Sequence, residues 1–181
     1  MSTRWTAARR YAGAIYQLAR QSNAVDRIGE ELQAIFDLTR ESRDLQRFID
    51  GGIGDSLSRR SAIKALFASR VHPALLNLLL LLDEKRRWRL FPELVEAYQR
   101  KVDADHGIVR MSILTAHPLT PAQRQSIDQR FGDKLNRTVV STVRSDPALL
   151  GGFIVRAGDV VFDASAASQL KRFHRELVTA L

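Results

Sequence analysis

Apolar positions recur every three or four residues along the first hundred residues, which is the spacing of one helix face. The first such segment has two neighbouring stripes that together cover about half of a helix circumference. One stripe contains Trp5, Ala8, Ala12, Ile15 and Ala19, and the other contains Ala7, Tyr11, Ala14 and Leu18. One stripe is enough to join a helical bundle. The second stripe then serves either a wider core contact, which is the commoner case, or a partner helix, whose close approach its small alanines allow.

The same period predicts five more helices before residue 106. They lie at about 28–39, 45–49, 58–67, 73–82 and 88–105. Ser58 is expected to cap the helix that follows it. His72-Pro73 is expected to begin the leucine-rich helix, because proline is favoured in a first turn. Residues 1–105 are therefore predicted to form a six-helix bundle.

The period changes near His106, where a second domain is expected to begin. Apolar and polar residues alternate over 108–114, as in a β-strand. Thr120-Pro121-Ala122-Gln123 is a capping-box sequence that predicts a helix ending near Gly132. Residues 137–143 predict a second strand, and the helix between the two strands favours parallel pairing.

Two glycine steps mark the strongest local signal. Gly158-Asp159 separates two apolar runs, which predicts a β-hairpin because glycine supplies the positive φ of the tight turn. Gly151-Gly152 precedes the first run and suggests a β-bulge or the close approach of another backbone. With a last helix expected over Ser165–Leu181, residues 106–181 form a small α/β domain. The whole chain is then α+β, with a helical domain at 1–105.

Two explanations of Gly152 remain open. One is a conformational need for positive φ, which asparagine could partly satisfy. The other is steric, in that no β-carbon fits against a neighbouring backbone. Two successive glycines exceed what one turn residue requires, which favours the steric explanation.

Composition changes this picture little. The chain has 181 residues, of which 45% are hydrophobic and 27% charged, as is ordinary for globular proteins. It has no cysteine, which excludes disulfides, thiol catalysis and thiolate metal sites. The longest apolar run, Ala74 to Leu82, is much shorter than the about 20 residues of a membrane-spanning helix, so none is expected.

The net charge of +8 divides evenly, with +4 on residues 1–105 and +4 on residues 106–181. Acidic and basic residues are interspersed, which favours a basic surface suited to acidic partners. A basic helical nucleic-acid-binding protein is the alternative, although such proteins usually concentrate their charge on one face or arm. Four arginines precede the first acidic residue, Asp26, in an amphipathic pattern like that of a mitochondrial transit peptide.

No motif for catalysis or cofactor binding is found in the sequence. Gly51-Gly52-Ile53-Gly54 lacks the Gly-Lys-Ser/Thr that follows in a phosphate loop, and Gly151-Gly152 lacks the dinucleotide fingerprint. The histidines show no metal-ligand spacing. Asp103-Ala104-Asp105-His106 is better explained as solvated charge at a helix end. The sequence therefore predicts no catalytic residue, no metal and no cofactor.

Two segments carry a family resemblance. Residues 8–19 read Ala-Arg-Arg-Tyr-Ala-Gly-Ala-Ile-Tyr-Gln-Leu-Ala, and residues 148–165 read Ala-Leu-Leu-Gly-Gly-Phe-Ile-Val-Arg-Ala-Gly-Asp-Val-Val-Phe-Asp-Ala-Ser. They resemble the first helix and the C-terminal signature of the delta subunit of F-type ATP synthases, the family of the mitochondrial oligomycin-sensitivity-conferring protein. The signature positions are Gly151, Gly152, Arg156, Gly158, Asp159 and Asp163. Ala164 departs from the pattern, which often has glycine there.

The resemblance implies a structural role without catalysis. In this family the N-terminal bundle holds the N-terminal segments of the alpha subunits at the top of the catalytic head. The C-terminal domain holds the end of the peripheral stalk, which is made of b subunits. The chain would be a stator that couples proton-driven rotation to ATP synthesis, peripheral on the cytoplasmic face of the bacterial plasma membrane. Because residues 8–19 match a structural helix, a mature N-terminus is expected rather than a transit peptide.

The resemblance also suggests where alpha binds. An amphipathic helix of alpha is expected in a groove between the second stripe of the first helix and the leucine-rich helix. The groove residues are Tyr11, Ala14, Leu18, Leu78 and Leu81. The choice of the leucine-rich helix as the second wall is implied by the family alone.

Overall fold

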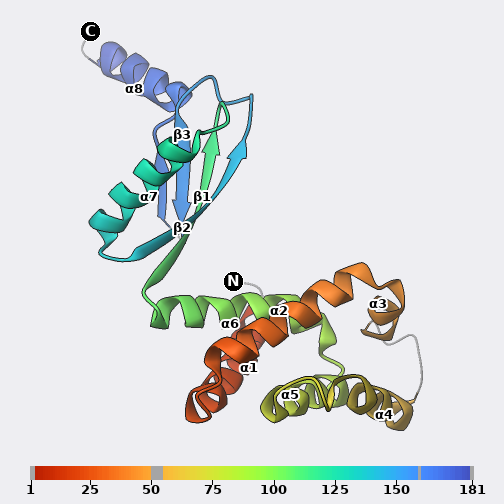
Figure 1. Cartoon of the computed structure of the whole chain (residues 1–181). Coiled ribbons are helices and arrows are strands. Elements are labelled where there is room, and N and C mark those ends of the chain that lie inside the picture. Colours follow the sequence, from red (N-terminus) through yellow and green to blue (C-terminus); the bar gives the residue numbers. More distant parts are fainter. Residues whose placement is uncertain (1–2, 50–54, 159, 180–181) are drawn as a thin grey trace. The chain divides into compact units, whose positions relative to one another are not determined.

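The structure, a computed structural model, describes residues 3–49, 55–158 and 160–179, with side chains as far as Arg172. The chain divides into two compact units, Met1–Val102 and Asp103–Leu181 (Figure 1). The described residues form helices in the first unit and helices with a four-stranded mixed sheet in the second, so the fold is α+β as predicted.

Helices make up the described part of the first unit. They are α1 (Thr3–Gln21), α2 (Val25–Glu41), α3 (Arg43–Ile49), α4 (Ser56–Phe67), α5 (Pro73–Glu84), the 3-10 helix η1 (Trp88–Leu90) and α6 (Phe91–Asp105). Each helix expected from the apolar period is present, with ends that differ by a few residues. The last turn of α6 belongs to the second unit.

Two helix starts test the predicted caps. At α5 the prediction is confirmed: Pro73 takes the first position, and the Nδ1 atom of His72 accepts a hydrogen bond from the Ala74 N–H at 3.2 Å. At α4 it is wrong, because the N-cap is Asp55. Its carboxylate accepts from the backbone N–H of Ser58 at 2.7 Å. A carboxylate just upstream thus satisfies the N–H group that the helix start leaves without a partner.

Helices of the first unit enclose a large apolar core. The first stripe of α1 faces it, and Ala8, Ala12 and Ala19 are completely buried. Tyr98 of α6 packs edge-on against the ring of Tyr16, with ring centroids 5.8 Å apart. Its hydroxyl donates to the Val25 backbone carbonyl of α2 at 2.8 Å, so this phenol has a hydrogen-bond partner in the core.

A buried ion pair joins α4 to α5. Arg59 donates to one carboxylate oxygen of Asp83 through Nε at 2.9 Å and Nη2 at 2.6 Å. The indole Nε1 of Trp88 donates to the same oxygen at 3.1 Å. The Arg59 guanidinium also lies over the ring of Phe48, 4.3 Å from its centroid. The Arg59–Asp83 pair is therefore a point where α3, α4, α5 and η1 are held together.

The second unit is a four-stranded sheet with a helix on one face. Its elements are β1 (Ile108–Thr115), α7 (Pro121–Leu135), β2 (Thr138–Ser145), β3 (Phe153–Ala157), β4 (Val160–Asp163) and α8 (Ala166–Thr179). The strand order is β2-β1-β3-β4. β1 and β2 are parallel, as predicted, and β3 is antiparallel to both β1 and β4. The capping box at Thr120 is present, and α7 continues past Gly132 to Leu135.

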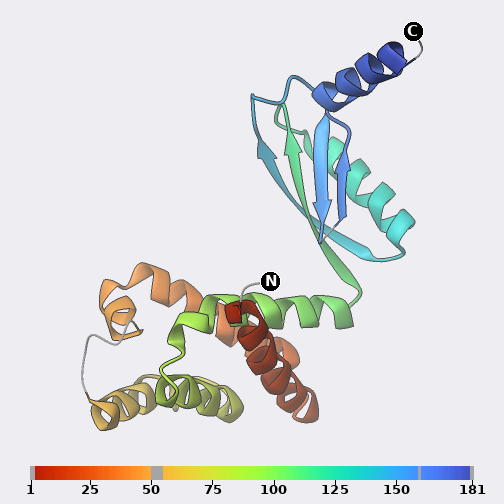
Figure 2. The same ribbon diagram turned by 180° about the vertical axis from the view of Figure 1, so that it is seen from behind.

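The core of the second unit lies between the sheet and α7. Met111, Ile113 and Val155 are its most deeply buried members, at no more than 2% exposure. Ile127 and Phe131 of α7 pack against them. Because side chains alternate along a strand, the residues between these point to the opposite face. Figure 2 shows the sheet from that side, with α7 behind it.

Candidate interaction surfaces

The predicted hairpin is formed by β3 and β4. Ala157 pairs with Val160, so two residues connect the strands. Gly158 has a φ of +61°, as the tight turn requires. Asp159, the second residue of the connection, lies outside the described residues.

Gly152 packs against the backbone that leads into α8. Its φ is +77°, and a β-carbon there would lie 2.2 Å from the carbonyl oxygen of Ala164. At Gly151 a β-carbon would make only an ordinary contact, 3.5 Å from the Cβ of Ala166, whose N–H donates to the Gly151 carbonyl at 2.9 Å. The conformational and steric explanations thus both apply to Gly152. The steric one excludes every side chain, because backbone atoms rather than a flexible side chain occupy the space.

The charged signature residues have separate roles. The carboxylate of Asp163 accepts from the Ser168 hydroxyl at 2.6 Å and from the Ser165 N–H at 2.9 Å, which ties the end of β4 to the first turn of α8. The hydrogen bond from Ser168 contributes most to holding the pKa of Asp163 below its ordinary value, and those from Ser165 contribute as well. Arg156 instead is exposed on the sheet face that α7 does not cover.

The residues expected to line the alpha groove lie on α1 and α5, which contact each other. Leu18 and Leu81 are 50% and 39% exposed. Ala14 is exposed and Tyr11 is half-buried. Leu78 differs from the other four, because it is only 7% exposed and belongs to the core. Two uncovered leucines and an exposed alanine are therefore available to a partner helix.

Two polar contacts were not predicted from the sequence. Arg87 donates to the Tyr11 hydroxyl at 2.9 Å. Asp103, expected to be solvated, is 6% exposed and accepts from Arg110 at 2.6 and 3.0 Å, so that expectation was wrong. Asp105 is exposed, as expected. The Asp103–Arg110 pair joins the end of α6 to β1. One residue lies in a helix and the other in a strand, so neither the helical nor the strand spacing of the sequence predicts the pair.

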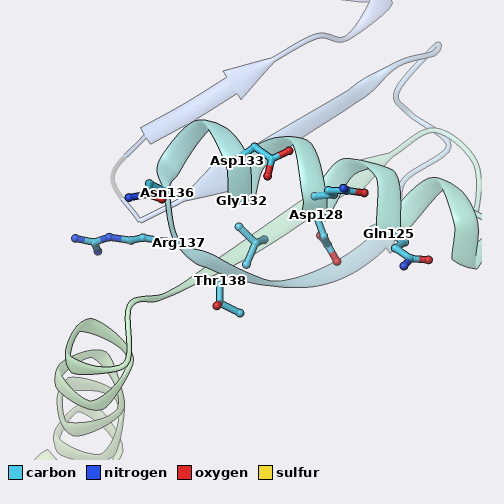
Figure 3. Close-up of a pocket in the computed structure, with 9 residues that line it drawn as sticks. Gln125, Asp128, Gly132, Asp133, Asn136, Arg137 and Thr138 are labelled. Atoms are coloured by element: carbon cyan, nitrogen blue, oxygen red, sulfur yellow. The ribbon is translucent and has the colours of Figure 1, made fainter.

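Hollows lie on both sides of the sheet. One of about 610 Å³ opens between the second half of α7 and the start of β2 (Figure 3), and its walls are polar. They include Gln125, Asp128, Asp133, Asn136 and Arg137. Another of about 530 Å³ lies on the face opposite α7, where Leu114 and Ile154 contribute apolar wall and Arg144 and Arg156 contribute charge.

Within the described ranges, no group of three or more histidine or acidic side chains is placed to hold a metal ion. None of the described helices is long and apolar enough to cross a membrane. Large apolar side chains remain exposed on helices and on a sheet face within the described residues.

Comparison with known proteins identifies the family. The sequence model described as ATP synthase delta (OSCP) subunit matches residues 7–177, and the chain belongs to this family. ATP synthase subunit delta of Geobacter sp. (strain M21) is 34% identical over 166 residues, which cover 91% of this chain and 92% of the relative. Its counterpart from Trichlorobacter lovleyi is 32% identical over 168 residues, with 92% and 93% covered.

The fold is also found in a solved complex. A chain in the cryo-EM structure of the Toxoplasma gondii mitochondrial ATP synthase hexamer matches with a TM-score of 0.75 at 18% identity, over 98% of each chain. At that identity the match concerns the fold alone. The family resemblance drawn from the first helix and the C-terminal signature is confirmed.

Proposed function

We propose that this chain is the non-catalytic stator subunit of an F-type ATP synthase. It links the alpha subunits of the catalytic head to the b subunits of the peripheral stalk, so that proton-driven rotation is coupled to ATP synthesis. The observation that carries the proposal is the family match, which extends over both units from residue 7 to residue 177. The chain would be peripheral on the cytoplasmic face of the bacterial plasma membrane, held there by the complex.

A stator resists the torque that rotation exerts on the head. This requires contacts that dissociate slowly, and it requires no chemistry from the stator itself. Differences in affinity between related complexes arise mainly from the dissociation rate, and a helix anchored in an apolar groove at i, i+3 and i+4 can supply such a contact. We assign alpha binding to the first unit, whose six helices would act as one bundle, and stalk binding to the second.

The proposed alpha site is the groove between α1 and α5. Tyr11, Ala14 and Leu18 form one wall, Leu81 stands on the other, and Leu78 lies beneath. Covering an exposed leucine completely contributes about 1.5–3 kcal/mol, so Leu18 and Leu81 would be the main anchors. Ala14, on the same stripe of α1 as Leu18, is small enough for a close helix approach.

The test is binding of the purified chain to purified alpha subunit. Ala14→Asp places an uncompensated charge in the groove and should weaken binding by several kcal/mol. Ala34→Asp makes the same change at an exposed position of α2 and should bind normally. A folded Ala14→Asp variant that binds as tightly as wild type would show that the groove is elsewhere.

The same experiment decides the function. A wild-type chain that does not bind alpha at all would overturn the stator proposal. Retention of that chain on duplex DNA, with a steep dependence on salt, would support the nucleic-acid-binding alternative instead.

A further inference from the structure

The sheet face opposite α7 combines apolar surface with charge. Residues of β1, β2 and β3 line a hollow of about 530 Å³ on this face. Those whose side chains point to this face are Ser112, Leu114, Thr142, Arg144, Ile154 and Arg156. In the register of the sheet, Leu114 lies between Arg144 and Ile154, and Ser112 lies between Thr142 and Arg156. The two arginines therefore stand at opposite corners of a small apolar and hydroxyl-bearing area.

Apolar surface continues to both edges of this face. Val140 of β2 is 40% exposed and Val161 of β4 is 53% exposed. Val140 lies on the same face as Arg144, and Val161 pairs with Arg156 and shares its face. A partner that covers the hollow would therefore bury valines from both edge strands as well.

Two arginines of this face form no ion pair within the part of the chain that the structure describes. Arg110 also points to it but is held by Asp103, whose hydrogen bonds raise the pKa of Arg110. Asp163, on the same face of β4, is engaged by the first turn of α8. Arg144 and Arg156 are exposed, and neither forms an ion pair with any residue that the structure describes. They are thus available to carboxylates from outside.

The separation of the two arginines indicates the shape of the ligand. Arg144 and Arg156 are two strands apart and two residues apart along the strand direction. With about 4.8 Å between strands and about 3.3 Å per residue, their Cα atoms are about 12 Å apart. Seven or eight residues of an α-helix, at about 1.5 Å each, span the same length. In such a helix, acidic residues at positions i and i+7 would lie on one face and reach the two arginines. Residues i+3 and i+4 would lie between them, over the hollow.

We propose that this face binds an acidic amphipathic helix of the stalk subunit b. The helix lies diagonally over β2, β1 and β3, with carboxylates on Arg144 and Arg156 and apolar side chains against Leu114 and Ile154. The inference rests on the proposed function, which assigns the stalk to this unit. Guanidinium–carboxylate pairs are strong and directional, so the two arginines set the register of the helix while the apolar contact is buried between them.

The experiment compares two double variants of the full-length chain. Arg144→Glu/Arg156→Glu turns both attractive pairs into repulsive ones, and its affinity for the soluble part of b should fall at least about 100-fold. Arg130→Glu/Arg137→Glu makes the same change in net charge at two other exposed positions of the unit, and should bind b within about threefold of wild type. Both variants should bind alpha as wild type does.

The outcomes separate this surface from the function itself. If wild type binds alpha and b, and Arg144→Glu/Arg156→Glu binds b equally well, the surface is wrong and the stator function stands. If wild type binds neither alpha nor b, both proposals fail. If wild type is instead retained on duplex DNA and the Arg144→Glu/Arg156→Glu variant is not, the face binds nucleic acid and both proposals are again overturned.

Single glutamine variants keep the test valid if the double glutamate variant does not fold. Arg144→Gln and Arg156→Gln remove each charge without adding an acid, and each should weaken b binding at least about fivefold. A search through Glu→Arg variants of b should find one that restores binding to Arg144→Glu or to Arg156→Glu. Full affinity for b in both glutamine variants would overturn the proposal even if the double glutamate variant did not fold.

Discussion

The two units of this protein are stabilised in different ways. The first encloses a large apolar core and adds the buried Arg59–Asp83 pair. The second has a thin core around Met111, Ile113 and Val155, and its sheet is covered by α7 on one face. Apolar burial is the main favourable term in folding. Among the residues whose side chains are described, the second unit therefore buries less apolar surface than the first.

The two units also differ in the surface that they leave exposed. A helical unit buries most of its apolar surface in its own core and leaves a few leucines, such as Leu18 and Leu81, outside. A sheet with a helix layer on one side leaves its other face to water or to a partner. Within the described residues, the first unit thus leaves a few exposed leucines, and the second leaves a sheet face on which Arg144 and Arg156 form no ion pair.

The largest effect is expected at Gly152. Gly152→Asp and Gly152→Ala should each destabilise the second unit by more than about 3 kcal/mol, because the new β-carbon meets the Ala164 carbonyl oxygen at 2.2 Å. Amide hydrogen exchange of the full chain should show lost protection in β1–β4 and normal protection in α1–α6.

Gly158→Ala is the matched control. Gly158 also has positive φ, but a β-carbon there meets nothing within 4 Å, so the cost should be about 1 kcal/mol. Equal costs at Gly152 and Gly158 would reject the steric explanation. If the chain is a stator, membranes that carry Gly152→Asp should hydrolyse ATP but not pump protons, and normal pumping would contradict the importance given to this contact.

The next effect tests the core of the first unit. Asp83→Ala leaves the Arg59 charge and the Trp88 N–H buried without their partner, and should cost about 3–5 kcal/mol in urea unfolding. Glu96→Ala removes an exposed pair with Arg100 and should cost no more than about 0.5 kcal/mol. Similar costs for the two variants would show that burial of the Asp83 pair does not matter.

A smaller effect concerns acid and the start of α8. The Ser168 hydroxyl and the Ser165 N–H lower the pKa of Asp163 from its ordinary 3.8. A lowered carboxyl pKa contributes stability above the ordinary value, and this contribution is lost as pH falls through the folded pKa. The Ser165 amide resonance should therefore shift in acid. Asp163→Asn should abolish that dependence, and a shift that persists would assign it to another group.

The least effect is expected from removing the second unit. A fragment of residues 1–105 contains the whole core of the first unit and should unfold cooperatively, with nearly the stability of that unit in the full chain. It should also keep the proposed affinity for alpha. A fragment that melts without a cooperative transition would show that the two units share one core.

Much of the fold could be predicted from local pattern. The stripes of α1, the capping box at Thr120, the parallel β1–β2 pair and the Gly158 hairpin all depend on neighbouring residues or on short-range rules. Such features are decided by side-chain period and by backbone φ, which a sequence states directly. The family followed from two segments, residues 8–19 and 148–165, for the same reason.

Tertiary structure decided what depends on distant partners. Asp83 ended an apolar run in the sequence, yet in the fold it is buried because Arg59, twenty-four residues away, reaches it. Asp103, at the end of α6, likewise pairs with a residue of another element, Arg110 of β1. The corner positions of Arg144 and Arg156 follow from strand order, which no local pattern fixes. The sequence alone thus determined the elements and the family, while packing determined which charges are paired and which remain for a partner.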